Sequence, residues 1–432
     1  MRILKIIHGY PPRYNAGSEV YSRSIVRGLL EKNHDVTVFS RYENPFEPDF
    51  STRIELDFYK KKKIPIHLIN IVRSKDRYQH EEVDKYVAGL IEKQKFDIVH
   101  IGHLNHLSTS LIQAIKQYSI PIIFTLHDYW LMCPRGQFIQ FNIGEKEPYQ
   151  LCEKQEDMIC AKKCYTRYIS GGVKSKEDIQ YWSSWVKQRM AHVQEMSSRV
   201  DLFIAPSRYL MDRFTQSKFI SKNKIKFLDY GFNTEILQGR KRKNIKNHIV
   251  FGYIGTHIPT KGIHQLIEAF GKTNGKSELL IWGKHRNEYT PFLKELSDRL
   301  PEERKKNIVW KEEYNNDNIV EDVFNHVDCI IVPSIWVENS PLVIHEALEA
   351  GVCVITADIG GMKEHIQHGK NGLLFKHRNV LSLKEQMQLL IDHPKKIEAL
   401  STGGYLYSED KHIPNIMTHI EDLEKIYLEL LK

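Results

Sequence analysis

Two glutamates, Glu338 and Glu346, lie eight positions apart in the segment VENSPLVIHEALEAG, residues 337–351. Asn339 or Ser340 suits the cap of a helix and Pro341 suits its first position, so we expect a helix from Pro341 to about residue 350. One carboxylate then precedes the helix and the other lies inside it among apolar side chains. A carboxylate in apolar surroundings needs a partner. The pair therefore predicts a ligand site, although each glutamate alone is more simply a solvated surface charge.

The segments around this helix predict a parallel sheet. Short apolar runs at 328–334 and 352–356 flank the helix, and Gly351 is suited to end it. The order strand, loop, helix, strand is typical of a βαβ unit. Ligands of such sheets bind at the carboxyl ends of the strands, where helices begin. Glu338 lies in one of these loops, so we expect the ligand at this edge of the sheet.

The same alternation occurs in two successive sets along the chain. It predicts the α/β class, with two Rossmann-like, doubly wound parallel-sheet domains facing across a cleft. We expect the first domain at residues 1–204 and the second at 205–408, followed by a helical segment at 409–432. The apolar runs are 3–8, 35–40, 96–101, 121–126 and 201–206 in the first set, and 248–255, 277–283, 307–310, 328–334 and 352–356 in the second.

Composition places the chain among ordinary soluble globular proteins. Of its 432 residues, 41% are hydrophobic and 27% charged, and 62 Lys and Arg against 54 Asp and Glu give a net charge of +8. No stretch approaches the roughly 18 apolar residues of a membrane span, and the N-terminus is typical of a buried strand, so we expect a cytoplasmic protein with no nucleic-acid partner. The basic clusters at 60–63 and 240–243 could meet anionic lipid head groups, although solvated loops are the simpler interpretation.

Two loops have the features of an anion site. The loop at 15–18 ends at a helix N-terminus, and the loop at 255–262, which contains Lys261, follows a strand and precedes a helix. Arg208, just past another strand, could join Lys261 and the helix start at Pro341 in neutralising a diphosphate without a metal. The chain has no Asp-x-Asp, and neither loop is a G-x-G-x-x-G, so NAD and a metal-clamped diphosphate are not favoured. A plain βα turn stays the alternative for the first loop.

In this combination, the residues resemble the retaining glycosyltransferases of family 4, which have the GT-B fold and use nucleotide-sugar donors. The family's E-x7-E motif is matched by Glu338 and Glu346 with an Asn-Ser-Pro-Leu insert, and Gly360-Gly361 and the segment GKNGLLF at 369–375 follow it. The matches occur in the family's order along nearly the whole chain. The remaining matches are Gly17, His127, Arg208 and Lys261.

The resemblance implies a role for each matched residue. Glu346 would hold the nucleotide ribose, and Glu338 would hold the donor sugar. Arg208 and Lys261 would neutralise the leaving diphosphate, and His127 would contact the donor sugar or the reacting centre. The other donor-binding residues would be Gly17, Asn339, Ser340, Pro341 and Leu342 around the sugar and diphosphate, and Trp282 and Gly283 near the base.

The resemblance also implies a function. We expect a retaining, hexosyltransferase-type enzyme that needs no cofactor or metal for catalysis and moves a sugar to a glycan or lipid-linked acceptor. Its setting would be cell-surface polysaccharide assembly, with peripheral contact at the inner face of the membrane, and its last helix, 409–432, would pack back on the first domain. A nucleotide-sugar epimerase, a phosphorylase and a binding or scaffold protein on a degenerate GT-B fold are the alternatives. The acid/base set of the first and the pyridoxal lysine of the second are not apparent, and a scaffold need not keep the four charged donor-site residues that are present.

Four of the six cysteines fall in an insertion-like segment at about 133–168, shortly after His127. Four converging thiolates in a cytosolic protein usually bind zinc. No C-x2-C pair is present, so a structural zinc or another metal, free thiols and disulfides all stay open. The segment could cap the acceptor side of the cleft. The four residues are Cys133, Cys152, Cys160 and Cys164.

Several aromatic and histidine side chains are candidates for acceptor contacts. Tyr181 and Trp185 lie beside a helical stripe at 179–193 whose simplest interpretation is core. These two could stack on an acceptor sugar or lie at a membrane interface. His103 and His106 follow a strand end, and are either acceptor contacts or polar loop residues.

Overall fold

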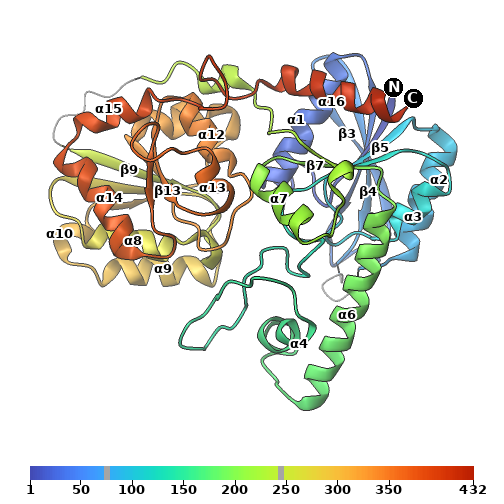
Figure 1. Ribbon diagram of the computed structural model, residues 1–432, viewed down its shortest axis with the longest axis horizontal. Helices are drawn as coiled ribbons and strands as arrows, with labels where there is room; N and C mark the ends of the chain where they lie inside the picture. The colour runs from blue at the N-terminus through green and yellow to red at the C-terminus, as the bar shows by residue number, and fades with distance from the viewer. Residues whose placement is uncertain (73–77, 242–247) are drawn as a thin grey trace. The chain divides into compact units, whose positions relative to one another are not determined.

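The computed structural model describes residues 1–72, 78–241 and 248–432, and the chain divides into two α/β units (Figure 1). Unit 1 consists of Met1–Gly231 with Ile416–Lys432, and unit 2 of Phe232–Asn415. The division thus falls later than residue 204, where we expected it. The reason is that β7 (Leu202–Ala205) continues through α7 (Arg208–Gln216) into β8 (Ile225–Phe227), which pairs with β7 in the sheet of unit 1.

Unit 1 is built on an eight-stranded sheet in the order β3-β4-β2-β1-β5-β6-β7-β8. Every neighbouring pair is parallel except β3 and β4, which form an antiparallel hairpin at one edge. The apolar runs predict the central strands but not β3, β4 or β8. The other strands are β1 (Arg2–Ile6), β2 (Asp35–Tyr42), β3 (Thr52–Tyr59), β4 (Lys62–Asn70), β5 (Ile98–Ile101) and β6 (Ile122–Thr125).

The helices of unit 1 include the last helix of the chain, α16 (Ile416–Leu430). Ile420 and Leu423 on α16 are fully buried, and the Tyr427 hydroxyl lies 2.6 Å from Nδ1 of His100. A Cβ on Gly28 of α1 would lie 2.6 Å from Cγ1 of Ile420, so the two helices pack in close contact. Besides α7, the other helices are α1 (Gly17–Glu31), α2 (Glu81–Gln94), α3 (Leu111–Lys116), α4 (Asp157–Cys160), α5 (Thr166–Tyr168) and α6 (Lys176–Ser198).

The insertion between β6 and β7 has a small core of its own. Tyr165, in a π-helical turn at Ala161–Tyr165, stacks on Trp182 of α6 with ring centroids 5.1 Å apart. Trp182, Val186 and Val193 are buried, so the core interpretation of this stripe is confirmed. Trp185 packs in the same cluster, whereas the Tyr181 side chain is 60% exposed.

Unit 2 contains a six-stranded, wholly parallel sheet in the order β11-β10-β9-β12-β13-β14. Its strands β12 and β13 are buried along their whole length, as expected for a sheet covered by helices on both faces. The strand order reverses on either side of β9, and ligands of doubly wound sheets bind beyond such a reversal. The strands are β9 (Ile249–Ile254), β10 (Ser277–Trp282), β11 (Ile308–Trp310), β12 (Cys329–Val332), β13 (Cys353–Ala357) and β14 (Leu373–Phe375). The helices are α8 (Ile263–Gly271), α9 (Tyr289–Asp298), α10 (Glu302–Lys305), α11 (Ile319–Asp322), α12 (Leu342–Glu349), α13 (Gly360–Glu364), α14 (Val380–Asp392) and α15 (Lys395–Ser401).

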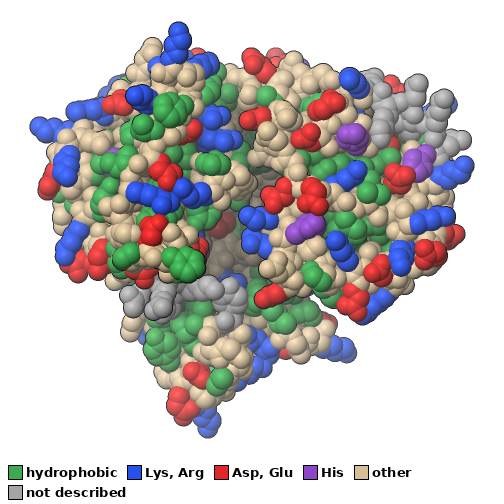
Figure 2. Space-filling view, turned by 180° about the vertical axis from the view of Figure 1, so that it is seen from behind, with side chains coloured by type: hydrophobic (Ala, Val, Ile, Leu, Met, Phe, Trp, Pro, Cys, Tyr) green, Lys and Arg blue, Asp and Glu red, His purple; other side chains and the backbone are tan. Residues whose placement is uncertain are grey.

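The surface carries charges of both signs, interspersed on the face drawn in Figure 2. The predicted basic cluster at 240–243 lies partly outside the described residues. Its first member, Arg240, is tied to the protein, because its guanidinium donates to the carbonyl oxygens of Phe324, Val327 and Gly351. Over the ranges described, no helix has the length and apolar character needed to cross a membrane.

Candidate active site

Glu338 and Lys261 meet at the carboxyl edge of the unit 2 sheet. Glu338 lies in the loop after β12, Lys261 in the loop after β9, and Nζ of the lysine is 2.6 Å from Oε1 of the glutamate. The Ser334 hydroxyl donates to the same oxygen at 2.5 Å. The N–H of Ile335 donates to the carbonyl of Thr260 at 2.9 Å, which fastens the two loops together. The structure therefore brings the predicted sugar-binding carboxylate and a predicted phosphate-binding cation into one ion pair.

Two glycines allow this close approach. Gly262 has a φ of +71°, and a Cβ there would lie 1.9 Å from the carbonyl oxygen of Pro333. A Cβ on Gly361 would lie 1.2 Å from the carbonyl oxygen of Asn339, and the Gly361 N–H donates to the carbonyl of Glu338 at 3.0 Å. Gly361, in the glycine pair after the E-x7-E helix, thus packs directly against the backbone of the Glu338 loop.

Helix α12 begins at Leu342 with Pro341 as its N-cap, and no side chain caps it. The prediction that Asn339 or Ser340 is the cap is therefore wrong, because the extended ψ of 118° at Pro341 places the proline itself before the first turn. Gly351 follows the helix with a φ of +63° and ends it as predicted. The first N–H groups of a helix have no partner within it, so this N-terminus, beside the Glu338 loop, is suited to an anion.

Glu346 lies on α12 and is partly buried. Burial raises the pKa of this carboxyl to about 7, and the neighbouring His345 acts in the opposite direction. No hydrogen bond or ion pair reaches the carboxylate from any residue that the structure describes. The pKa of the Tyr314 phenol is raised, mainly by burial and in addition by the nearby charge of Glu346. No motif predicts this neighbour of Glu346. A carboxylate of this kind gains from a ligand that donates hydrogen bonds to it.

The loops after β9 and β10 also touch. Trp282 is the buried last residue of β10, and a Cβ on the following Gly283 would lie 1.9 Å from the carbonyl oxygen of Gly255. His257, in the first of these loops, is buried and meets the edge of the Trp310 ring, with ring centroids 5.7 Å apart. Burial lowers the pKa of His257 to about 4, so it is neutral at pH 7. The contact between His257 and Trp310 was not predicted from the sequence.

Unit 1 gathers three histidines at the carboxyl edge of its own sheet. His8 follows β1, His103 follows β5 and His127 follows β6, and the rings of His8 and His103 are 4.6 Å apart. Nε2 of His103 lies 3.3 Å from the Asp128 carboxylate, and Nδ1 of His127 lies 2.8 Å from the Tyr230 hydroxyl. Burial lowers the pKa of His8 and of His127, so both rings are neutral at pH 7.

Gly17 is the first residue of α1, where we expected a diphosphate contact. A carboxylate already lies in this first turn. Burial would raise the pKa of Glu19, but hydrogen bonds from His8 and Ser18 hold it at about 2. The fixed negative charge partly cancels the attraction of this helix N-terminus for an anion. The role of Gly17 stays a prediction.

Arg208 is the first residue of α7, after the N-cap Ser207, whose hydroxyl accepts from the N–H of Leu210 at 3.1 Å. Its guanidinium lies 4.5 Å from the centroid of the Phe227 ring. Arg208 belongs to unit 1 and Lys261 to unit 2. The predicted pairing of these two cations on one diphosphate therefore stays a prediction.

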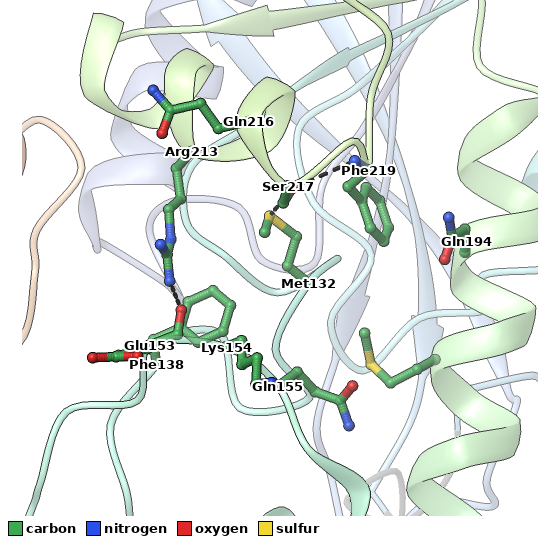
Figure 3. Close-up of a pocket in the computed structure, with 11 residues that line it drawn as sticks. Met132, Phe138, Glu153, Lys154, Gln155, Gln194, Arg213, Gln216, Ser217 and Phe219 are labelled. Atoms are coloured by element: carbon green, nitrogen blue, oxygen red, sulfur yellow. Dashed lines mark hydrogen bonds between the residues drawn. The ribbon is translucent and has the colours of Figure 1, made fainter.

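A hollow of about 430 Å³ lies in unit 1 between the insertion and helices α6 and α7 (Figure 3). Arg213 on α7 donates to the carbonyl oxygen of Glu153, and its guanidinium lies 5.1 Å from the centroid of the Phe138 ring. Apolar side chains and amides line the same space. The other lining residues are Met132, Lys154, Gln155, Met190, Gln194, Gln216, Ser217 and Phe219.

The insertion cysteines are all free thiols, so none is paired in a disulfide. Burial, with the other thiols adding to it, raises the pKa of Cys152 to about 12, and burial raises that of Cys164 to about 11. Within the described ranges, no three of the cysteine sulfurs lie within 4.8 Å of one another. The structure thus places Cys133, Cys152, Cys160 and Cys164 in one region without closing a metal site.

Two family models match adjacent parts of the chain. Glycosyltransferase Family 4 matches residues 16–236, and Glycosyl transferases group 1 matches residues 236–406. The chain is similar to the capsular polysaccharide biosynthesis glycosyltransferase CapM of Staphylococcus aureus, with 26% identity over 396 residues, which cover 88% of this chain and 94% of CapM.

Solved structures share the fold at low sequence identity. Anabaena HepE in complex with UDP and glucose superposes with a TM-score of 0.69 at 16% identity, over 99% of this chain and 100% of HepE. The lipopolysaccharide outer core galactosyltransferase WaaB superposes with a TM-score of 0.63 at 14% identity, over 100% of each chain. Both likenesses show the fold alone.

Proposed function

Because the chain belongs to the glycosyltransferases of family 4 and has their GT-B fold, we propose that it is a retaining enzyme that moves a hexose from a nucleotide-diphosphate sugar to a glycan or lipid-linked acceptor. One observation carries the proposal: the N-terminus of α12 lies between the Lys261–Glu338 ion pair and the Glu346 carboxylate, which no described residue pairs with. A cation and a helix N-terminus are suited to bind a diphosphate, and two carboxylates are suited to accept hydrogen bonds from the hydroxyls of a sugar and a ribose. HepE was solved with UDP-glucose, so a uridine-diphosphate hexose is the first donor to test.

The donor would lie along these residues in a fixed order. Glu346 would accept hydrogen bonds from the ribose hydroxyls and Glu338 from the sugar hydroxyls. The diphosphate between them would meet the N–H groups of α12 and the ammonium of Lys261, with Arg208 of unit 1 as the second cation. Trp282 and Gly283 would lie near the base. Glu338 holds Lys261 in position, so the protein itself orients the cation at this edge of the sheet.

The reaction would run on the front face of the sugar. The bond between the anomeric carbon and the diphosphate oxygen breaks, and the acceptor oxygen bonds to the same carbon on the same face. The acceptor proton passes to the leaving phosphate, so the protein need not supply a base. Fixed donors aimed at the leaving oxygens supply the catalysis, and one such donor is worth roughly 2.7–4 kcal/mol. The neutral His127 would contact the sugar, and the mechanism needs no metal.

The acceptor would bind in unit 1, where His103 and the mixed polar and apolar hollow of Figure 3 offer hydrogen bonds and stacking. CapM takes part in capsular polysaccharide biosynthesis, which supports a cell-surface polysaccharide as the product. A cytoplasmic location with peripheral contact at the inner face of the membrane fits a lipid-linked acceptor. A structural zinc on the four insertion cysteines is a separate proposal.

The test is a panel of nucleotide sugars incubated with the purified chain in the presence of EDTA. We expect nucleotide diphosphate to be released from one donor and, with a matching acceptor, a product whose anomeric configuration by NMR equals that of the donor. An inverted product would refute the retaining mechanism. Loss of release in EDTA that magnesium restores would refute metal-independent catalysis.

A further inference from the structure

The edge strand β3 turns a row of apolar side chains toward solvent. Ile54, Leu56 and Phe58 alternate along the strand, and their side chains are 59%, 50% and 58% exposed. The residues that alternate with them, at positions 53, 55, 57 and 59, are charged or polar and only partly exposed. A strand at the edge of an antiparallel pair normally shows the reverse arrangement, with its polar face in water.

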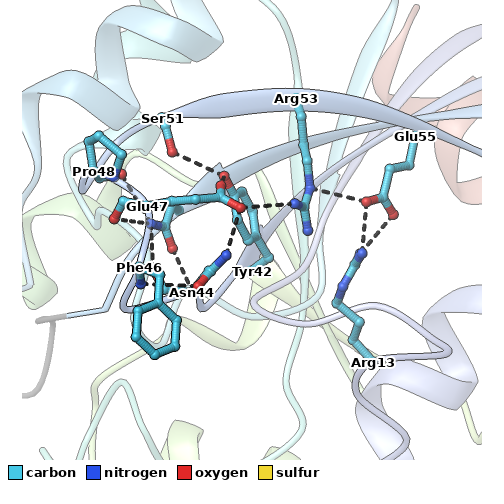
Figure 4. A network of polar contacts seen from close by, with 10 residues as sticks. Arg13, Tyr42, Asn44, Phe46, Glu47, Pro48, Ser51, Arg53 and Glu55 are labelled. Atoms are coloured by element: carbon cyan, nitrogen blue, oxygen red, sulfur yellow. Dashed lines mark hydrogen bonds and ion pairs between the residues drawn. The ribbon is translucent and has the colours of Figure 1, made fainter.

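Ion pairs hold this arrangement in place (Figure 4). Arg13 donates to both carboxylate oxygens of Glu55 at 2.7 Å, and Nε of Arg53 lies 3.1 Å from the same carboxylate. Arg53 also lies 3.5 Å from the Glu47 carboxylate and 3.8 Å from the centroid of the Tyr42 ring. A slip of one residue would exchange the two faces of the strand. These contacts oppose that slip, so the apolar row stays outside.

Four successive lysines, at positions 60–63, form the turn after β3 and the start of β4. Lys60 and Lys62 are bound to the body of unit 1, through Glu31 and through the backbone oxygen of residue 30. Lys63 lies directly opposite Phe58 in the β3–β4 ladder, and opposite residues of an antiparallel pair share a face. Lys61 is at the tip of the turn and exposed. Lys63 therefore presents its charge on the same face as the apolar row.

We propose that the β3–β4 hairpin docks the protein on the surface of an anionic lipid bilayer. Ile54, Leu56 and Phe58 enter the boundary between head groups and acyl chains, and Lys61 and Lys63 bind the anionic head groups. A second copy of the chain fits this surface less well. Three side chains supply far less than the roughly 1,200 Å² of a stable protein interface, and lysines at a sheet edge discourage strand pairing. The docking does not depend on the transfer reaction, so either proposal can fail alone.

The test is flotation of the full chain with vesicles of phosphatidylcholine alone or mixed with phosphatidylglycerol. We expect binding only to the mixed vesicles, and release at high salt, because screening weakens lysine–lipid attraction. The variant Lys61→Glu/Lys63→Glu should bind at least about tenfold more weakly, since each surface lysine contributes roughly a fivefold change in partitioning. The variant Ile54→Ser/Leu56→Ser/Phe58→Ser should lose flotation.

Matched controls distinguish binding by this surface from nonspecific hydrophobic adsorption and from an effect of net charge. Phe292→Ser/Leu381→Ser/Leu428→Ser removes three side chains of similar exposure elsewhere, and Lys187→Glu/Lys395→Glu makes the same change in net charge. Both controls should float like the unaltered chain, and all variants should keep its melting temperature and nucleotide binding.

Three outcomes would overturn the proposal. They are no flotation of the unaltered chain with mixed vesicles, equal losses in test and control variants, and a dimer by sedimentation velocity without lipid that the triple serine variant abolishes. The last outcome would assign the surface to a second copy.

Discussion

Replacing Glu346 with glutamine should stabilise the ligand-free protein at alkaline pH and weaken its binding of nucleotides. Burial raises the pKa of this carboxyl from 4.5 to about 7. Between these values the folded protein binds more protons than the unfolded chain, so the contribution of Glu346 to stability falls as the pH rises through about 7. Glutamine has nearly the same shape and no charge, so the variant should lack this loss.

The magnitude follows from the change in pKa. A rise from 4.5 to about 7, at 1.36 kcal/mol per unit, gives an upper limit of about 3 kcal/mol. Because Glu346 is only partly buried, solvent screening reduces this, and we expect about 1–2 kcal/mol. Urea unfolding near pH 3.5, below both pKa values, should give equal free energies for variant and wild type, and near pH 8.5 the variant should be the more stable by about this amount.

Glu349, one turn further along α12, offers a matched control. Its carboxylate lies 2.9 Å from Nδ1 of His412 and accepts from the N–H of Ile413 at 3.1 Å. Glu349→Gln should therefore destabilise the protein, with the opposite sign. If Glu346→Gln is also destabilising at alkaline pH, the carboxylate has a partner in the folded protein and the reasoning fails.

The same variant tests the division of the donor. By calorimetry, Glu346→Gln should weaken nucleotide diphosphate and intact donor alike, by about 1–3 kcal/mol, because one of the two carboxylate oxygens that would accept from the ribose hydroxyls becomes an NH2 donor. Glu338→Ala should weaken the intact donor, spare the bare nucleotide and lower turnover more. Equal losses for both ligands in both variants would refute the assignment of ribose to one glutamate and sugar to the other.

Three other changes test the positioning of the site and the insertion. Gly361→Ala should lower donor affinity and cost about 2 kcal/mol or more of stability in urea unfolding, because its Cβ would overlap the Asn339 carbonyl. Metal analysis of protein purified in reducing buffer should find about one zinc per chain, and Cys160→Ser should then lower the melting temperature more than donor affinity. Truncation before Ile416 should abolish cooperative melting of unit 1 and reduce activity, since Ile420 and Leu423 are fully buried there.

A control variant or a contradicting result tests each of these three expectations. Gly89, inside α2, has open space around it, so Gly89→Ala should stabilise by about 1 kcal/mol, and a loss there would discredit the clash argument at Gly361. Four freely titrating thiols without metal would contradict the zinc proposal. An unchanged melting curve after truncation would show that α16 adds no stability to unit 1.

Local sequence features predict most of the parallel strands and the close loops. Apolar runs mark strands buried on both faces, and a glycine marks a place where backbone approaches backbone, as at Gly361. The hairpin β3–β4 was not predicted because its charged residues face the protein, where partners such as Arg13 and Glu47 come from other segments. The spacing of the two glutamates singles out Glu346 as a candidate, whereas its raised pKa could not be predicted. That shift comes from burial, and burial is set by tertiary packing.

The pairing of α16 with α1 has a consequence for synthesis. Unit 2 is one continuous stretch, but unit 1 needs both the first 231 residues and the last helix. A chain emerging from the ribosome can therefore close unit 2 before unit 1 is whole, against the usual order in which N-terminal domains finish first. Until Ile420 arrives, the surface around Gly28 is open to chaperones and proteases. Chaperones and proteases would thus recognise a chain that lacks its last helix by the uncovered surface of unit 1, the part that was synthesised first.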